Sequence, residues 1–259
     1  MSTAAILLET RDSVPVDLLA AAFEQGAALP RPAALRLAQR ARWFAWENAP
    51  ADAASKVCQS LLDAGISARV VPQSAIVPVS TPRRVHVLNL DEAALGVQLK
   101  YTGPPEWIPW PNVLVLSAGA IQTETTKTEV HETVTTHGQL LVDSRVQVDI
   151  SRLILADVYA QAADGVLHYF RLNSREVNYA QTIGGSIQEG WREKFALLLA
   201  RLGLKATSAL VSPETESLLA AGLVPDAAVP SPYFASEADF AQYNRWLATR
   251  KRLGLGLSL

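Results

Sequence analysis

The sequence predicts an α+β protein: a small unit of mixed strands and helices, followed by an antiparallel β unit closed by one helix. The chain has 259 residues, 49% hydrophobic and 19% charged, which is enough apolar material for two cores and too little charge for a disordered polymer. Strand and helix patterns alternate over short distances up to residue 77, and strand patterns dominate after residue 84. The proline-rich stretch Pro72–Pro82 between them is a candidate linker.

The first region is expected to contain three strands and three helices. Compact apolar runs predict strands at Ala4–Glu9, Trp43–Trp46 and Ser67–Val71. Helical spacing predicts helices at Val16–Phe23, Ala33–Arg42 and Asp52–Ala64. Gly26 and Gly65 are expected to end the first and third helices. The resulting order, β-α-α-β-α-β, is typical of a small sheet covered by helices on one face.

This order and the segment LLDAGISARVV at residues 61–71 resemble the C-terminal domain of the bacterial ribosomal stalk protein L7/L12. The resemblance covers residues 3–77 and implies an α/β domain at residues 1–77. In that family, lysines of the first helix hairpin recruit translation factors. The comparable stretch here, Val14–Ala38, contains Asp17, Leu18 and Leu19 and no lysine. The resemblance therefore implies the fold without the factor-binding chemistry.

The second region, residues 82–204, is expected to be a β domain. Strands are predicted at Arg84–Leu90, Gly96–Tyr101, Asn112–Leu116, Arg152–Gln161, Val166–Leu172 and Asn178–Ile183. Turns are predicted at Asp91-Glu92, Ala118-Gly119 and Asp164-Gly165, the last being a typical hairpin signal. The amphipathic segment Ser186–Leu204 is expected to close the domain as a helix, with Gly203 at its end.

Antiparallel strands ended by one packed helix resemble the pleckstrin-homology-like (PH-like) and GRAM-like superfold. The run Ile108-Pro109-Trp110-Pro111-Asn112-Val113, with Ala118-Gly119 after it, resembles a strand-entry pattern of its bacterial members. Members of that superfold bind lipids, peptides or proteins and are seldom catalytic. The resemblance therefore implies binding as the function of this domain.

The threonine-rich insertion Thr123–Gln147 leaves two alternatives. One is a protruding hairpin that turns at His137-Gly138 and returns through Leu140–Val148, and the other is a disordered loop. Residues 205–259 are expected to form a helical extension and an apolar tail. Helices are predicted there at Pro213–Ala221 and Glu237–Arg252, the second capped by Ser236.

Two features are candidate interaction sites. Trp107 and Trp110 are fenced by prolines, which makes them the tryptophans least obliged to be internal. The tail at residues 253–259 alternates leucine with glycine or serine, so in extended form all its leucines share one face. It either docks on the protein's own body or binds a partner, and it resembles the Gly-Leu-rich tails that direct cargo into encapsulin shells. The candidate interaction residues are Trp107, Trp110, Leu253, Leu255, Leu257 and Leu259.

No catalytic, cofactor-binding or metal-binding residues are predicted. The sequence has no Gly-x-Ser-x-Gly elbow, no P-loop and no His-Glu-x-x-His. Glu129, His131 and His137 share a strand face, but histidines six residues apart are about 20 Å apart on a strand, too far for one ion. Gly184-Gly185-Ser186 fits a tight turn better than an anion nest. The single cysteine, Cys58, excludes internal disulfides and is expected to be a buried hydrophobe.

Charge and hydropathy limit the partners. A net charge of −2 gives no global field for nucleic acid, and no stretch approaches the length of a membrane span. We therefore expect a non-catalytic interaction or scaffolding protein of the bacterial cytoplasm that acts through protein–protein contacts. An enzyme of unrecognised type is the main alternative. The next is a small-ligand or lipid-binding sensor that contacts membranes through Arg250-Lys251-Arg252.

Overall fold

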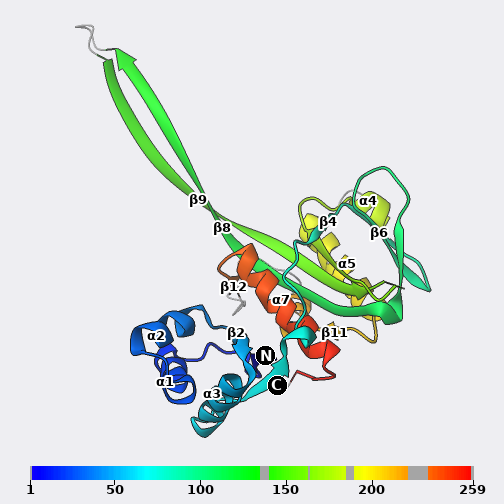
Figure 1. Cartoon of the computed structure of the whole chain (residues 1–259). Coiled ribbons are helices and arrows are strands. Elements are labelled where there is room, and N and C mark those ends of the chain that lie inside the picture. The colour runs from blue at the N-terminus through cyan, green and yellow to red at the C-terminus, as the bar shows by residue number, and fades with distance from the viewer. Residues whose placement is uncertain (1, 135–139, 163, 185–189, 221–232, 258–259) are drawn as a thin grey trace.

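The computed structural model describes residues 2–134, 140–162, 164–184, 190–220 and 233–257 (Figure 1). It contains both helices and antiparallel sheets, which confirms the α+β class. Helices of the N-terminal part, two further sheets and the C-terminal helix form one body, and a long two-stranded ribbon projects from it (Figure 1).

Residues 3–72 form a three-stranded antiparallel sheet with three helices, in the expected β-α-α-β-α-β order. The sheet order is β2-β1-β3, so β1 lies in the centre. The elements are β1 (Thr3–Leu8), α1 (Val16–Ala27), α2 (Arg31–Arg40), β2 (Phe44–Pro50), α3 (Ala51–Asp63) and β3 (Ala68–Pro72).

The central strand β1 is buried on both faces, which explains its unbroken apolar run. Ile6 and Leu8 belong to the core shared with α1, α2 and α3. Ala5 and Leu7 belong to a second core, which includes side chains of the C-terminal helix and of the large sheet. The N-terminal sheet therefore lies between its own helices and the rest of the protein.

Gly26 does not end α1, contrary to the expectation from the sequence. The helix continues to Ala27, and Ala28 follows it in the left-handed conformation with φ 51°. A Cβ atom at Gly26 would lie 2.5 Å from the Cα of Val57 in α3. The glycine thus allows two helices to approach closely, a contact that local sequence does not reveal.

Two further sheets share a bent strand. The predicted strand Arg84–Leu90 is divided at His86 into two elements: the first pairs in parallel with β10, and the second pairs antiparallel with β6. The elements are β4 (Arg83–Val85), β5 (Val87–Leu90), β6 (Ala94–Gln98), β7 (Glu106–Pro109), β8 (Val113–Val134), β9 (Leu140–Gln161) and β10 (Leu167–Asn173). The hairpins β5-β6 and β9-β10 fulfil the expectations for those segments.

The larger sheet has the order β11-β8-β9-β10-β4, and β12 also pairs with β8. Both β11 (Leu210–Val211) and β12 (Tyr233–Phe234) come from the segment expected to be a helical extension. That segment also forms α6 (Pro213–Ala220) and α7 (Glu237–Arg252), as predicted. Ser236 caps α7, since its Oγ accepts a hydrogen bond from the Asp239 amide at 3.1 Å.

One core lies between the two sheets and α5 (Trp191–Lys205), and it includes Leu88, Ile108, Leu116, Phe170, Phe195 and Leu199. The expected closing helix is therefore present over residues 191–205, and Gly203 lies within it instead of ending it. The start of the predicted helix, residues 186–189, lies outside the described residues.

Two local predictions in this region were wrong. Ala118-Gly119 is not a turn but part of β8, where a Cβ atom at Gly119 would lie 2.7 Å from the ring of Phe234. Asn178–Ile183 is not a strand, because the Asn178 side chain accepts a hydrogen bond from the Gln181 amide and caps the short helix α4 (Tyr179–Thr182).

The candidate linker Pro72–Pro82 is partly fixed to the body. Gln73–Ala75 forms a 3₁₀ turn, and Ile76 and Val77 are buried in the core beneath α7. Residues 78–81 are exposed. The buried side chains of Ile76 and Val77 therefore hold in place a segment that its prolines predicted to be a linker.

Candidate functional site

The two-stranded ribbon formed by β8 and β9 is the best candidate for a binding surface in this fold. Beyond the body, β8 and β9 pair from Gln122↔Arg152 to Val134↔Leu140. These thirteen consecutive pairs make a ribbon about 40 Å long at about 3.4 Å per residue. The threonine-rich insertion is thus a protruding hairpin (Figure 1), as the first of the two alternatives required. Its expected turn, His137-Gly138, lies outside the described residues.

Both outer edges of the ribbon are open within the described part of the chain. Strands β11 and β12 pair with β8 only at residues 115–116 and 120–121. Strand β10 pairs with β9 only at residues 155–161. In the described ranges, no third strand continues the sheet along residues 122–134 or 140–153.

The register assigns the residues of the ribbon to its two faces. Paired residues share a face and alternate along each strand, so even-numbered residues of both strands share one face. On β9 the even positions include the apolar residues Leu140, Val142, Val146, Val148 and Ile150. The odd positions include Asp143, Arg145, Gln147, Asp149 and Ser151. Over residues 140–152 of β9, apolar residues therefore predominate at even positions and polar or charged residues at odd positions, with Leu141, Ser144 and Arg152 as exceptions.

A buried polar cluster fixes β9 inside the body, five residues from the first pair of the ribbon. Asp157 of β9 is fully buried, and Arg171 of β10 donates to its carboxylate through Nε and Nη2, each at 2.8 Å. Asn244 of α7 donates at 2.7 Å, and the Tyr169 hydroxyl donates as well. This carboxylate is fully engaged, so we assign it a structural role: it joins β9, β10 and α7.

The cluster also keeps the phenol of Tyr169 protonated. Burial, reinforced by the neighbouring Asp157 carboxylate, raises the pKa of Tyr169 well above its usual value. Tyr159 stacks on Tyr169 with ring centroids 4.3 Å apart, and burial raises its pKa too. Tyr169 is therefore protonated at neutral pH and donates a hydrogen bond to Asp157.

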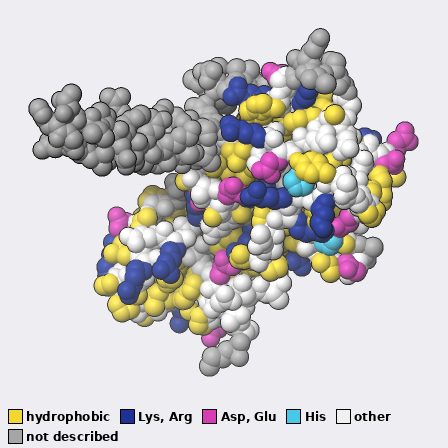
Figure 2. All heavy atoms as spheres, turned by 90° about the horizontal axis from the view of Figure 1, so that it is seen from above, with side chains coloured by type: hydrophobic (Ala, Val, Ile, Leu, Met, Phe, Trp, Pro, Cys, Tyr) yellow, Lys and Arg dark blue, Asp and Glu magenta, His cyan; other side chains and the backbone are white. Residues whose placement is uncertain are grey.

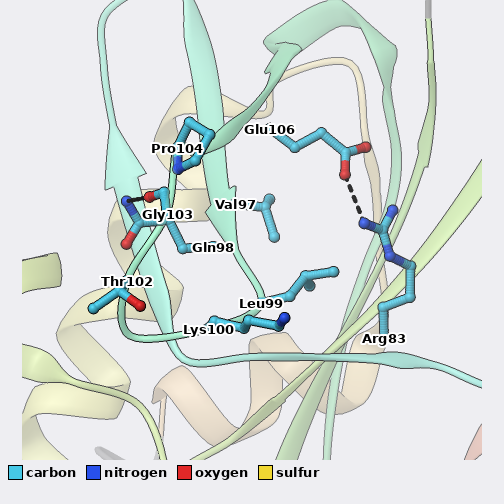
Figure 3. Close-up of a pocket in the computed structure, with 9 residues that line it drawn as sticks. All are labelled: Arg83, Val97, Gln98, Leu99, Lys100, Thr102, Gly103, Pro104 and Glu106. Carbon is cyan, nitrogen blue, oxygen red and sulfur yellow. Dashed lines mark hydrogen bonds and ion pairs between the residues drawn. The ribbon is translucent and has the colours of Figure 1, made fainter.

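A pocket of about 360 Å³ lies beside the loop between β6 and β7 (Figure 3). Arg83 and Glu106 form an ion pair of 2.8 Å at its edge, and His168 contacts both of them. Lys100 also lines the pocket and has no ion-pair partner among the described residues. The two cations, Arg83 and Lys100, outnumber the carboxylate of Glu106, which favours a small anion as ligand. At the ion-paired edge, however, Arg83, Glu106 and His168 already have partners.

A second pocket, of about 390 Å³, lies where the N-terminal part meets α7. Its walls include Glu47 of β2, Tyr159 of β9 and Arg245 of α7. Arg245 is nearly buried and pairs with Glu47, with Nη1 and Oε1 2.9 Å apart, so the two charges cancel within the wall. This pocket fits a neutral ligand better than a charged one.

The two candidate tryptophans do not form one surface. Trp107 on β7 is 52% exposed and its ring lies over Gly96 of the paired strand. Trp110 is buried, and its indole N–H donates to the Asp91 carbonyl at 3.0 Å. Only Trp107 is available for contact.

The apolar tail lies against the body over its described part. Leu253, Leu255 and Leu257 pack against the core beneath α7, and Arg250 donates to the Gly256 carbonyl. Leu259 lies outside the described residues. These contacts correspond to the alternative in which the tail docks on its own protein.

The basic run at the end of α7 is largely engaged. Arg250 is buried, with its guanidinium 4.9 Å from the Trp246 ring centroid. Lys251 donates to the Ser208 carbonyl at 2.6 Å, while Arg252 is exposed. The run therefore offers little free charge to a membrane surface.

The remaining candidates from the sequence are dispersed. His131 pairs with Asp143 on the ribbon, and the residues described contain no group of three His, Cys, Asp or Glu side chains placed to hold a metal ion. Cys58 is buried, and burial raises the pKa of its thiol. Of the possible anion nest, only Gly184 is described.

Positive and negative side chains are mixed on one face of the body. Figure 2 shows one face of the body, on which Lys and Arg side chains lie next to Asp, Glu and hydrophobic ones. On that face, the described residues form no broad region of one sign that would attract a highly charged polymer.

Sequence reasoning missed the charged edge of the first pocket and the ion pair between Glu47 and Arg245 in the wall of the second. Arg83, Glu106 and His168 come from three strands, and no local pattern connects them. The alternation along the ribbon had a signal, since residues 145–151 alternate strictly between polar and apolar.

Comparison with protein-family models, with curated proteins and with solved structures gave no match for this chain. Among the helices described, none has the length and apolar character needed to cross a membrane.

Proposed function

We propose that this chain is a non-catalytic interaction or scaffolding protein of the bacterial cytoplasm that binds protein through the β8-β9 ribbon. The observation that carries the proposal is the length of the ribbon together with its two open edges. A strand edge presents a row of backbone N–H and C=O groups, which is a template for an added strand.

Energetics support a partner for this ribbon. A two-stranded ribbon that packs on nothing is marginally stable in water, whereas a third or fourth strand adds hydrogen bonds and cross-strand contacts. Strand β9, which continues into the ribbon, is firmly held within the body by the Asp157 cluster. A rigid base with an under-stabilised arm is the arrangement expected of a segment that gains its stability on binding.

The finer architecture is part of the same proposal. We propose that residues 1–77 are an L7/L12-like module, supported by the β-α-α-β-α-β order and the three-stranded antiparallel sheet. We propose that residues 82–204 form a PH-like domain. Its support is the first strand shared between two sheets and the single helix α5 that closes the core. In this architecture the ribbon is a hairpin grown from a binding scaffold.

Photo-crosslinking in the native cell tests the proposal. A benzophenone amino acid at Ser144, an exposed ribbon position, should form protein adducts. The same group at Val166, which is 52% exposed on the turn between β9 and β10, is the control. Adducts that depend on the Ser144 position support the proposal. Equal adduct patterns at both positions, or none at Ser144, would overturn it, provided that both variants melt as the wild type does.

A further inference from the structure

We infer that the ribbon binds the ribbon of a second copy of this chain, with β9 antiparallel to β9 around a two-fold axis. The inference rests on the proposed function, because it names the partner of the same surface. The product would be a four-stranded sheet with the strand order β8-β9-β9-β8, extending between two bodies.

The free edge of β9 makes this pairing geometrically simple. Its residues 140–153 have no strand partner on the outer side within the described residues. A two-fold axis perpendicular to the ribbon brings the same edge of two copies together in antiparallel orientation. In this geometry each residue lies opposite a residue on the same face of the sheet. The axis must therefore pass midway between the two copies of one residue, which lie opposite each other.

The order of charges on β9 selects among these registers. With the axis at Gln147, Arg145 of each copy lies opposite Asp149 of the other. With the axis at Ser144, Arg145 lies opposite Asp143. Opposite charges placed directly across antiparallel strands are stabilising.

The neighbouring registers lack this complementarity. An axis at Arg145 or Asp149 places that residue opposite its own copy, and an axis at Val146 places Asp143 opposite Asp149. Each of these sets like charges across the pair, which is destabilising. An axis at Val148 places no charged residue opposite another charge in this stretch.

The apolar residues at even positions are also compatible with these two registers, although they pair with one another in the neighbouring registers as well. With the axis at Gln147, Val146 lies opposite Val148 of the other copy, and with the axis at Ser144, Val142 lies opposite Val146. Cross-strand pairs of β-branched residues stabilise sheets. One strand therefore carries a charge pattern and an apolar pattern that are both self-complementary.

Sedimentation velocity over a concentration series gives the first test. The wild-type chain should show a monomer–dimer equilibrium. A variant in which Asn-Gly joins Glu124 directly to Ile150 removes the outer ribbon at a paired position and should be monomeric with an unchanged melting temperature. A wild type that stays monomeric, or a shortened variant that still dimerises, overturns the inference.

Single cysteines then locate the axis. Gln147→Cys should form a disulfide-linked dimer under mild oxidation if the axis lies there, and Ser144→Cys should do so in the other register. Val166→Cys on the body is the control, and the buried Cys58 contributes little background. Cross-linking at neither ribbon position, or equally at Val166, contradicts the pairing.

A charge swap completes the experiment and separates the inference from the proposed function. Arg145→Asp should weaken the dimer at least about tenfold, because it places like charges opposite each other, and adding Asp149→Arg or Asp143→Arg should restore it in the matching register. No weakening by Arg145→Asp, or no rescue by either second change, would count against the pairing.

If the purified chain is monomeric while Ser144 photo-adducts contain a different protein, the self-pairing fails and the proposed function stands. If neither dimers nor adducts form, both fail.

Discussion

The carbonyl oxygen of Val77 accepts a hydrogen bond from Nε of Arg245 at 2.6 Å, across 168 residues of sequence. The amide of Val77 donates to Oγ1 of Thr249 at 3.1 Å, so α7 satisfies both backbone polar groups of this buried residue. Helix α7 thereby fixes the segment that leads from the N-terminal sheet to the other two sheets. The C-terminal helix is the common support of the body.

Replacing Arg245 by alanine should therefore destabilise the whole protein. The change removes the bond to Val77 and the ion pair with Glu47, and it removes a guanidinium 4.7 Å from the Phe44 ring centroid. Because Glu47 retains some access to water, we expect a loss of about 2–4 kcal/mol in the free energy of unfolding. Urea titration of Arg245→Ala measures this loss. Arg252→Ala, at an exposed position of the same helix, should change it by less than about 0.5 kcal/mol, and equal effects would contradict the assignment.

Two glycines should respond in opposite directions to alanine. A Cβ atom at Gly119 would lie within 3.0 Å of the rings of Phe234 and Phe240, so Gly119→Ala should cost about 1–3 kcal/mol. Gly203 lies in α5 with nothing within 4 Å of an added Cβ, and Gly203→Ala should stabilise the helix by up to about 1 kcal/mol. Thermal unfolding of both variants tests this, and a neutral Gly119→Ala would show that β8 adapts to the methyl group.

Local chemistry made most elements predictable. Ser236 caps α7 through one short hydrogen bond, and Asp164-Gly165 connects β9 to β10, so both were evident from a few neighbouring residues. The errors arose where a distant residue decides the structure. Gly26 faces Val57, Gly119 faces Phe234, and α7 fixes Val77, and no single-sequence pattern connects these partners.

The candidate site was predictable in the same uneven way. The sequence left a hairpin and a disordered loop as alternatives for the insertion, and the hairpin had local support because strand periodicity is local. The exposure of Trp107 and the burial of Trp110 could not be predicted from the sequence. They depend on the register of β7 and on the hydrogen bond between the Trp110 indole and the Asp91 carbonyl. The pocket beside Arg83 and Glu106 required three strands to be placed first.

Four tyrosines should remain protonated in the folded protein at alkaline pH. Burial raises the pKa values of Tyr159, Tyr169, Tyr179 and Tyr243 above the usual value of about 10. A raised pKa in the folded state means that these groups contribute stability fully below about pH 10 and lose it as the pH rises further.

Ultraviolet titration of tyrosinate tests this expectation. The folded protein should show four fewer ionised tyrosines than the urea-unfolded chain at the same alkaline pH, and they should appear together when circular dichroism reports unfolding. Full ionisation of all tyrosines near pH 10 with an intact dichroism spectrum would contradict their burial.

Truncation after Arg252 tests whether the apolar tail completes the fold. Leu253, Leu255 and Leu257 are partly buried against the core beneath α7, and burying each contributes about 1 kcal/mol. Their loss, with the bond between Arg250 and Gly256, should lower the free energy of unfolding by about 2–4 kcal/mol and lower the melting temperature. Leu204→Ala removes a leucine that is 79% exposed and should leave both nearly unchanged. If the truncated chain melts like the wild type, the tail contributes nothing to the fold, and its leucines become candidates for binding a partner. Because the ribbon lies outside the deletion, its dimerisation should survive, which separates the role of the tail from that of the ribbon.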